Sequence, residues 1–219
     1  MQKNANTSKW IDISVNLSDG MVHWPGDPPV NIVRVQDLDK GDTHSLSRLT
    51  MGSHSGTHVD APSHFIRGAA SISDLGPDVL IGPARVIEIE NQDVINIDEL
   101  RRHQFQPGER VLFKTRNSDF WKASVKFETD FVHISVEAAE FLAQAGISVI
   151  GVDYLSVGGY KQNGSQVHQV LLKAGIWLIE GLDLSPVGPG VYDMICLPLK
   201  IKHGDGSPAR AVLRQSVSR

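Results

Sequence analysis

Four side chains that can bind a metal or carry a proton lie within eleven positions of the chain: His54, His58, Asp60 and His64. Imidazole and carboxylate groups are the ligands that borderline divalent cations such as zinc and manganese accept. The same stretch contains a glycine and a proline, which favour an irregular or extended segment over a long helix. The cluster therefore predicts chemistry that is assisted by a bound metal.

The spacing of His54 and His58 allows one competing interpretation. In the zincin metalloproteases, two histidines four positions apart share a helix face, and the residue after the first is a glutamate that acts as base. Here that position holds Ser55. In an extended backbone, His58 and Asp60 project from the same face, because side chains alternate along a strand. We therefore expect a loop-and-strand site, in which a turn at Ser55-Gly56 brings His54 beside the other two side chains.

A second pair of donors, His168 and Glu180, lies far along the chain. Glu180 closes the apolar run 176–179, where an ionised carboxylate needs a partner. His168 falls on the first turn of a predicted helix, so the two residues could supply further ligands to the first cluster. The alternative is a salt-bridged or capping Glu180 and a surface His168. These residues by themselves leave both interpretations open.

The elements that must position these residues are mostly strands. Alternating apolar residues predict a first strand over 11–17. Helices are predicted at 97–103, 135–145 and 166–174, the second beginning at the N-cap Ser135 and ending at Gly146. Further strands are predicted at 30–36, 45–51, 84–90, 110–115, 148–154, 176–180, 191–201 and 209–213. A strand-rich first half and a βαβ-like second half favour an α/β fold with a mixed sheet covered by a few helices.

Composition limits the classes of function. The chain has 219 residues, a formal net charge of −4 and a single cysteine, Cys196. The absence of a basic cluster argues against a nucleic-acid partner, and no apolar run is long enough to cross a bilayer. The polar start lacks the apolar core of a secretory signal, and a lone cysteine in an apolar run suits a buried position in a reducing cytoplasm. We expect one cytoplasmic domain over residues 1–219.

One motif resembles the signature of the metal-dependent cyclase family, which includes bacterial kynurenine formamidases and isatin hydrolases. It is the string His54-Ser-Gly-Thr-His58-Val-Asp60-Ala-Pro-Ser-His64-Phe65. Other segments resemble the family in the same order along the chain: Asp12-Ile-Ser, Trp24-Pro-Gly-Asp27, Gly151-Val-Asp153, His168, Glu180-Gly-Leu-Asp183, Leu197-Pro-Leu199 and Asp205-Gly-Ser-Pro-Ala-Arg210. The resemblance implies a swivelling β/β/α fold around a mixed, barrel-like sheet, and assembly into a homodimer or a larger homo-oligomer.

The resemblance also implies roles for individual residues. His54, His58 and Asp60 would bind one metal, and His168 and Glu180 would complete a second, with Asp60 and Glu180 able to bridge. His64 matches the family's catalytic histidine. Trp24 matches a tryptophan that lines the substrate pocket, although in a proline-rich loop it could simply pack against the prolines. We expect one or two divalent ions, with zinc favoured and manganese as the alternative. A further hypothesis is that Asp153 orients a ligand histidine.

We therefore expect a metal-dependent amidohydrolase in which metal-activated water cleaves a small-molecule carbon–nitrogen bond, with His64 as acid and base. The expected substrate is an aryl formamide such as N-formylkynurenine. The stretch 154–160 departs from the formamidase pattern, so hydrolytic ring opening of a cyclic imide or lactam is the closest alternative. A non-catalytic module that binds a metal or a small molecule, and a ring-closing cyclase, are the other classes to distinguish.

Overall fold

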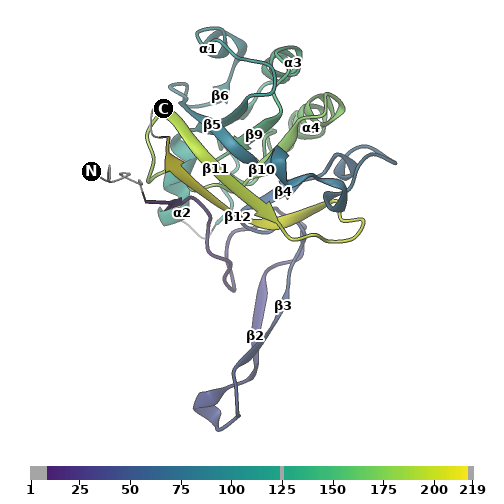
Figure 1. Cartoon of the computed structure of the whole chain (residues 1–219), viewed down its shortest axis with the longest axis vertical. Helices are drawn as coiled ribbons and strands as arrows, with labels where there is room; N and C mark the ends of the chain where they lie inside the picture. The colour runs from purple at the N-terminus through teal and green to yellow at the C-terminus, as the bar shows by residue number, and fades with distance from the viewer. Residues whose placement is uncertain (1–8, 124–125, 217–219) are drawn as a thin grey trace, which may run out of the picture.

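The structure consists of a closed β-sheet, a layer of helices and one long hairpin (Figure 1). The computed structural model describes residues 9–123 and 126–216. Its strands are β1 (Ile11–Asp12), β2 (Asn31–Gln36), β3 (Leu46–Thr50), β4 (His58–Asp60), β5 (Ile81–Glu88), β6 (Val94–Ile95), β7 (Arg110–Lys114), β8 (His133–Ile134), β9 (Val149–Val152), β10 (Trp177–Glu180), β11 (Gly190–Pro198) and β12 (Gly206–Gln215). Its α-helices are α1 (Ile97–Leu100), α2 (Phe120–Ala123), α3 (Val136–Gln144) and α4 (Gly164–Lys173).

The central sheet closes into a barrel. Its strands follow the order β12-β11-β5-β7-β9-β10-β4, and β4 pairs back onto the start of β12. The short strand β1 pairs with a later part of β12. Strands β5, β7, β9 and β10 run parallel to one another, and the remaining pairs in the sheet are antiparallel. The predicted α/β class with a mixed, barrel-like sheet is confirmed.

The parallel strands are apolar because both of their faces are covered. In β7, Val111 and Phe113 belong to the hydrophobic cluster that faces the helices, whereas Leu112 belongs to the cluster inside the barrel. All three side chains are fully buried. Helices α1, α3 and α4 lie together along one side of the sheet (Figure 1). Helix α3 begins where predicted, since the Ser135 side chain accepts a hydrogen bond from the backbone N–H of Ala138.

The first strand differs from the prediction. Regular pairing is limited to Ile11–Asp12 against β12, followed by an isolated bridge between Ser14 and Leu182. Ile13 is fully buried inside the barrel, which accounts for part of the apolar alternation. No strand is assigned to residues 15–17, so the alternation continues there without a strand partner.

The hairpin arm, residues 31–50, consists of β2 and β3 and extends far from the barrel (Figure 1). It carries four large hydrophobic side chains that are 45–59% exposed: Val35, Leu38, Leu46 and Leu49. Its two strands pair only with each other. Across the described residues, no helix has both the length and the apolar character needed to cross a membrane.

Candidate active site

Strand β4 is three residues long and holds two of the predicted ligands. It pairs on one side with β10 and on the other with β12, so that Asp60 lies opposite both Leu178 and Gly206. Before the strand, Gly56 has a φ of 62°, a left-handed conformation that favours glycine and makes the expected turn. After it, Pro62 begins a 3-10 turn. The structure therefore has the loop and strand that the spacing predicted.

Hydrogen bonds fix the ring orientation of two histidines. Nδ1 of His58 lies 2.9 Å from the carbonyl oxygen of Gly56, and Nδ1 of His168 lies 2.7 Å from that of Gly164. A carbonyl oxygen only accepts, so each Nδ1 must carry the proton and donate it. The Nε2 atom of each neutral ring is consequently left with a free lone pair. Such an arrangement is characteristic of histidines that bind metals.

Both Nε2 atoms face the carboxylates of Asp60 and Glu180. Nε2 of His58 lies 3.4 Å from an oxygen of each carboxylate. Nε2 of His168 lies 3.2 Å from Glu180 and 3.6 Å from Asp60. These four side chains come from β4, α4 and β10, and all are buried. The structure thus brings the second predicted pair, His168 and Glu180, onto the first cluster.

His54 has a different environment. Its Nδ1 lies 2.7 Å from Asp60, and its Nε2 lies 3.1 Å from Asp205. Its ring stacks against His64 with 3.9 Å between ring centroids. His54 therefore connects the buried carboxylates to the more exposed side of the cluster.

The electrostatics favour positive charge at this centre. Burial would lower the pKa of His58, but the Asp60 and Glu180 carboxylates raise it to about 10. Burial likewise opposes charge on His168, yet Glu180 and Asp60 raise its pKa. Burial would raise the pKa of Asp60, but His54 and His58 hold it well below the usual carboxyl range. Two buried carboxylates need compensating positive charge, which protons or a cation can supply.

The donor set fits a divalent cation. His58 Nε2 and Asp60 Oδ2 are buried and form no hydrogen bond within the described part of the chain. One donor atom each from His58, Asp60 and Glu180 lie within 4.8 Å of one another, and so do donors from His54, Asp60 and His64. Asp60 belongs to both groups. Imidazole and carboxylate donors at such distances suit zinc or manganese.

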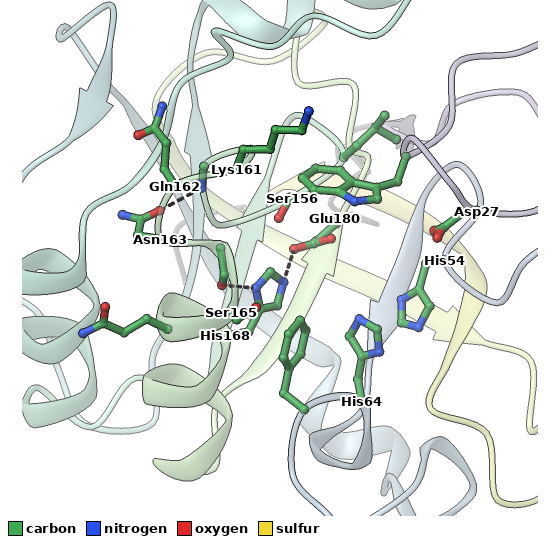
Figure 2. A pocket seen from close by; sticks show the side chains of 16 residues that line it. Asp27, His54, His64, Ser156, Lys161, Gln162, Asn163, Ser165, His168 and Glu180 are labelled. Atoms are coloured by element: carbon green, nitrogen blue, oxygen red, sulfur yellow. Dashed lines mark hydrogen bonds and ion pairs between the residues drawn. The ribbon is translucent and has the colours of Figure 1, made fainter.

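A cavity of about 500 Å³ opens onto this centre (Figure 2). His54, His64, His168 and Glu180 line it, together with Trp24. Trp24 contacts the aromatic rings of Phe127 and Tyr160, with ring centroids 5.2 and 5.4 Å apart, so it does not merely pack against the neighbouring prolines. Phe65 stacks on His168 at 4.3 Å. A cavity with aromatic walls and ionisable groups at its base is suited to a small aromatic ligand.

The comparisons with known proteins agree with this geometry. The Cyclase family model matches residues 11–158. A kynurenine formamidase from Bacillus thuringiensis (strain Al Hakam) is 38% identical over 208 residues, which cover 95% of this chain and 98% of that protein. The chain belongs to the Cyclase family. The predicted family and the predicted class, a metal-dependent amidohydrolase, are therefore confirmed.

Solved structures share the whole fold of this Cyclase family member. A protein from Bacillus stearothermophilus described as a "predicted metal-dependent hydrolase" has a TM-score of 0.83 at 31% identity, with 95% of this chain and 98% of that chain covered. Isatin hydrolase A from Ralstonia solanacearum has a TM-score of 0.82 at 24% identity, with 95% and 92% covered. At 24% identity, the similarity to isatin hydrolase A shows a shared fold and nothing more.

Two residues next to the centre had no predicted role. Asp205 accepts a hydrogen bond from His54 and also lies 3.8 Å from Nδ1 of His64. Gly206 leaves room for the His54 ring, because an added Cβ would lie 2.5 Å from His54 Cε1. Both belong to segment 205–210, which resembles the family, and this resemblance is the sequence signal that could have pointed to them. Their contact with His54 depends on the pairing of β4 with β12.

Contrary to the hypothesis, Asp153 orients no ligand histidine among the described residues and instead binds Thr115 and Ser118. Its carboxylate accepts hydrogen bonds from the backbone N–H and the hydroxyl of both Thr115 and Ser118, and it contacts no histidine among the described residues. Burial raises the pKa of Asp153 to about 6 even though these four donors favour the ionised form. Asp153 thus holds the 3-10 turn Arg116–Asp119 onto the end of β9.

Replacing Asp153 by alanine should lower the free energy of unfolding by about 2–4 kcal/mol, because it leaves several buried donors without an acceptor. Urea denaturation measures the change. Asp119→Ala is the matched control, since Asp119 lies in the same turn but is exposed, and it should stay within about 0.5 kcal/mol of the parent protein. Equal stability of the two variants would contradict the structural role assigned to Asp153.

Proposed function

We propose that this chain hydrolyses an aryl formamide, such as N-formylkynurenine, at a centre that holds one or two divalent ions. His54, His58, Asp60, His168 and Glu180 would be the ligands, and zinc is the favoured ion over manganese. The observation that carries the proposal is the convergence of His58 Nε2 and His168 Nε2 on two buried carboxylates at one end of an aromatic cavity. The kynurenine formamidase relatives support the choice of substrate.

The reaction adds water across the amide bond. The C–N bond breaks, the hydroxyl of water goes to the formyl carbon and a proton goes to the nitrogen, which gives formate and a free arylamine. When bound, the cation supplies Lewis acidity, which polarises a carbonyl oxygen and makes water a stronger nucleophile. The chain's own residues must then bind the ring and carry the proton.

His64 is suited to carry the proton. Its side chain is 30% exposed and lines the cavity, so it can reach both a water molecule and a bound substrate. Burial lowers the pKa of His64, and the neighbouring His54 and His168 lower it further, against the opposing effect of Asp60 and Glu180. A lowered pKa keeps the imidazole neutral at neutral pH, where it can accept a proton from water and deliver it to the departing nitrogen.

Trp24 would provide the wall against which the aryl ring lies. Edge contacts to Phe127 and Tyr160 hold its indole in place, and it lines the same cavity as His64 and Glu180. The segment that departs from the formamidase pattern borders this space, since Leu155, Ser156 and Gly159 line the cavity. These residues therefore contribute to the choice among aryl amides.

The direct test is reconstitution. The chain is stripped with a chelator, reloaded with zinc or manganese, and assayed with N-formylkynurenine, formanilide and isatin. Hydrolysis of the formamides supports the proposal, and the metal that restores the higher rate identifies the preferred ion. Turnover of isatin alone would replace the proposal by hydrolytic ring opening. Bound metal without turnover of any of the three compounds would favour a non-catalytic binding module.

We also propose that the protein forms a cytoplasmic homodimer through the hairpin arm. Exposed single apolar residues are common, but four on one isolated two-stranded arm form a surface that a second copy could cover. Leu38 lies at the tip and Leu46 begins the returning strand. Burial of these side chains would stabilise both the arm and the dimer.

The double variant Leu38→Ser/Leu46→Ser should shift the protein from dimer to monomer, because it removes apolar area from the arm. Size-exclusion chromatography with light scattering gives the mass. Leu199→Ser/Ile201→Ser is the control, since these residues are also at least 40% exposed but lie outside the arm. A monomeric parent protein, or an unchanged dimer in the arm variant, would refute this interface.

A further inference from the structure

Lys161 places a positive charge on the cavity beside the aromatic wall. It lines the cavity together with Trp24 and His64, and it is the sole lysine or arginine among the residues that do so. Its ammonium nitrogen lies 5.2 Å from the ring centroid of Tyr160, which in turn contacts Trp24 edge-on. Figure 2 shows Lys161 on the opposite side of the cavity from His64.

The charge of Lys161 is not matched by an acidic side chain among the described residues. No carboxylate forms an ion pair with it in the part of the chain that the structure describes. Asp27 also lines the cavity, but Figure 2 shows it near His54 and away from Lys161. Glu180 is buried at the base, where His58 and His168 face it.

The backbone around Lys161 is unusual for a lysine. Its φ is 53°, a left-handed conformation that side chains other than glycine and asparagine rarely adopt. This conformation leads directly into α4, whose first residues Gly164 and Ser165 also line the cavity. Asn163 uses its side-chain oxygen to accept from Gly159 and does not cap the helix. The partial positive charge at the start of α4 therefore adds to that of the ammonium group.

We infer that Lys161 binds an anionic group of the substrate, so that the cavity selects aryl amides that carry a carboxylate. The inference rests on the proposed amidohydrolase function and narrows its substrate class. The aromatic wall would hold the ring, the metal centre would receive the amide, and Lys161 would receive the carboxylate. Neutral aryl formamides would lack this last contact, and they would bind more weakly for that reason.

Binding of two product-like ligands tests this without turnover. Kynurenine carries an α-carboxylate, whereas kynurenamine has the same ring and amine without it. Calorimetry on the metal-loaded protein should give about fivefold tighter binding of kynurenine, the upper range for a partly exposed ion pair. Lys161→Gln should abolish that difference, and Lys161→Arg should keep it. Lys173→Gln, at the exposed other end of α4, should behave like the parent protein.

Kinetics provide the second measurement. Lys161→Gln should raise KM for N-formylkynurenine about fivefold and leave kcat, as well as KM for formanilide, nearly unchanged. Equal binding of the two ligands by the parent protein, or an equal loss for both in Lys161→Gln, would overturn the role of Lys161. If the ligands are distinguished but no formamide is hydrolysed, the proposed function fails and the carboxylate site stands. If formamides are hydrolysed but the parent protein binds kynurenine and kynurenamine equally, the proposed function stands and the carboxylate site fails.

Discussion

Replacing Asp60 by asparagine should remove the bound cation and, with it, hydrolysis. Asp60 is fully buried and lies within ion-pair distance of three histidines, His54 at 2.7 Å, His58 at 3.4 Å and His168 at 3.6 Å. Asparagine has nearly the same shape but no negative charge, so Glu180 alone would have to balance the cation. Metal affinity should fall by more than the roughly 10–100-fold cost of losing an outer-shell partner of a metal site.

Elemental analysis after dialysis measures the metal content, and the formamide assay measures turnover. Asp193→Asn provides the control, because Asp193 is a partly exposed carboxylate of β11 that pairs with Arg214 and does not line the cavity. It should keep both metal and activity. Full metal content in the Asp60→Asn protein would show that Asp60 is not a ligand, and would leave the proposed centre without its shared carboxylate.

Replacing His64 by glutamine should leave the cation in place and reduce turnover by about 10²–10⁴-fold, the usual contribution of a general acid–base group. His64 is the most exposed of the cluster histidines, and its ring stacks on that of His54. Glutamine keeps a polar side chain on the cavity but cannot exchange a proton near neutral pH. The rate should fall chiefly in kcat, because the cavity walls are unchanged.

The metal content of the His64→Gln protein distinguishes a proton-carrying His64 from a metal-binding one. Donor atoms of His64, His54 and Asp60 lie close enough to share an ion, so His64 could itself be a ligand. If His64→Gln loses metal and activity together, the residue binds the cation and the proton carrier must be sought elsewhere. His103→Gln is the control histidine, since His103 lies outside this cavity, and it should change neither quantity.

Much of the fold could be predicted because local patterns and long-range partners agree. The apolar run Val111-Leu112-Phe113 predicts a strand covered on both faces, and β7 is such a strand. Ser135 and Gly146 mark the two ends of α3 by capping chemistry alone. The alternation over residues 11–17 was less informative. Alternation reports which side chains are buried but does not specify a partner strand, and here regular pairing stops after Asp12, with one isolated bridge at Ser14.

The site was predictable where its residues are neighbours in sequence. His54, His58 and Asp60 are joined by a glycine turn and a short strand, whose geometry follows from elementary rules. The role of Asp205 was not predictable in this way. Its contact with His54 exists because Gly206 pairs with Asp60 across β12 and β4, and no local pattern specifies that register. Lys161 was missed for the same reason, because only the folded loop places it on the cavity.

The position of β4 sets the order in which the site can be assembled during synthesis. Residues 58–60 are synthesised before the two segments that pair with them, 178–180 and 206–208. Glu180 and His168 are likewise late. A nascent chain that stops before these segments therefore lacks both strand partners of β4, even though His54, His58 and Asp60 have already been made. We expect the ion to be captured only after residues 206–208 have been made and have paired with β4, and products truncated before residue 206 to bind it more weakly.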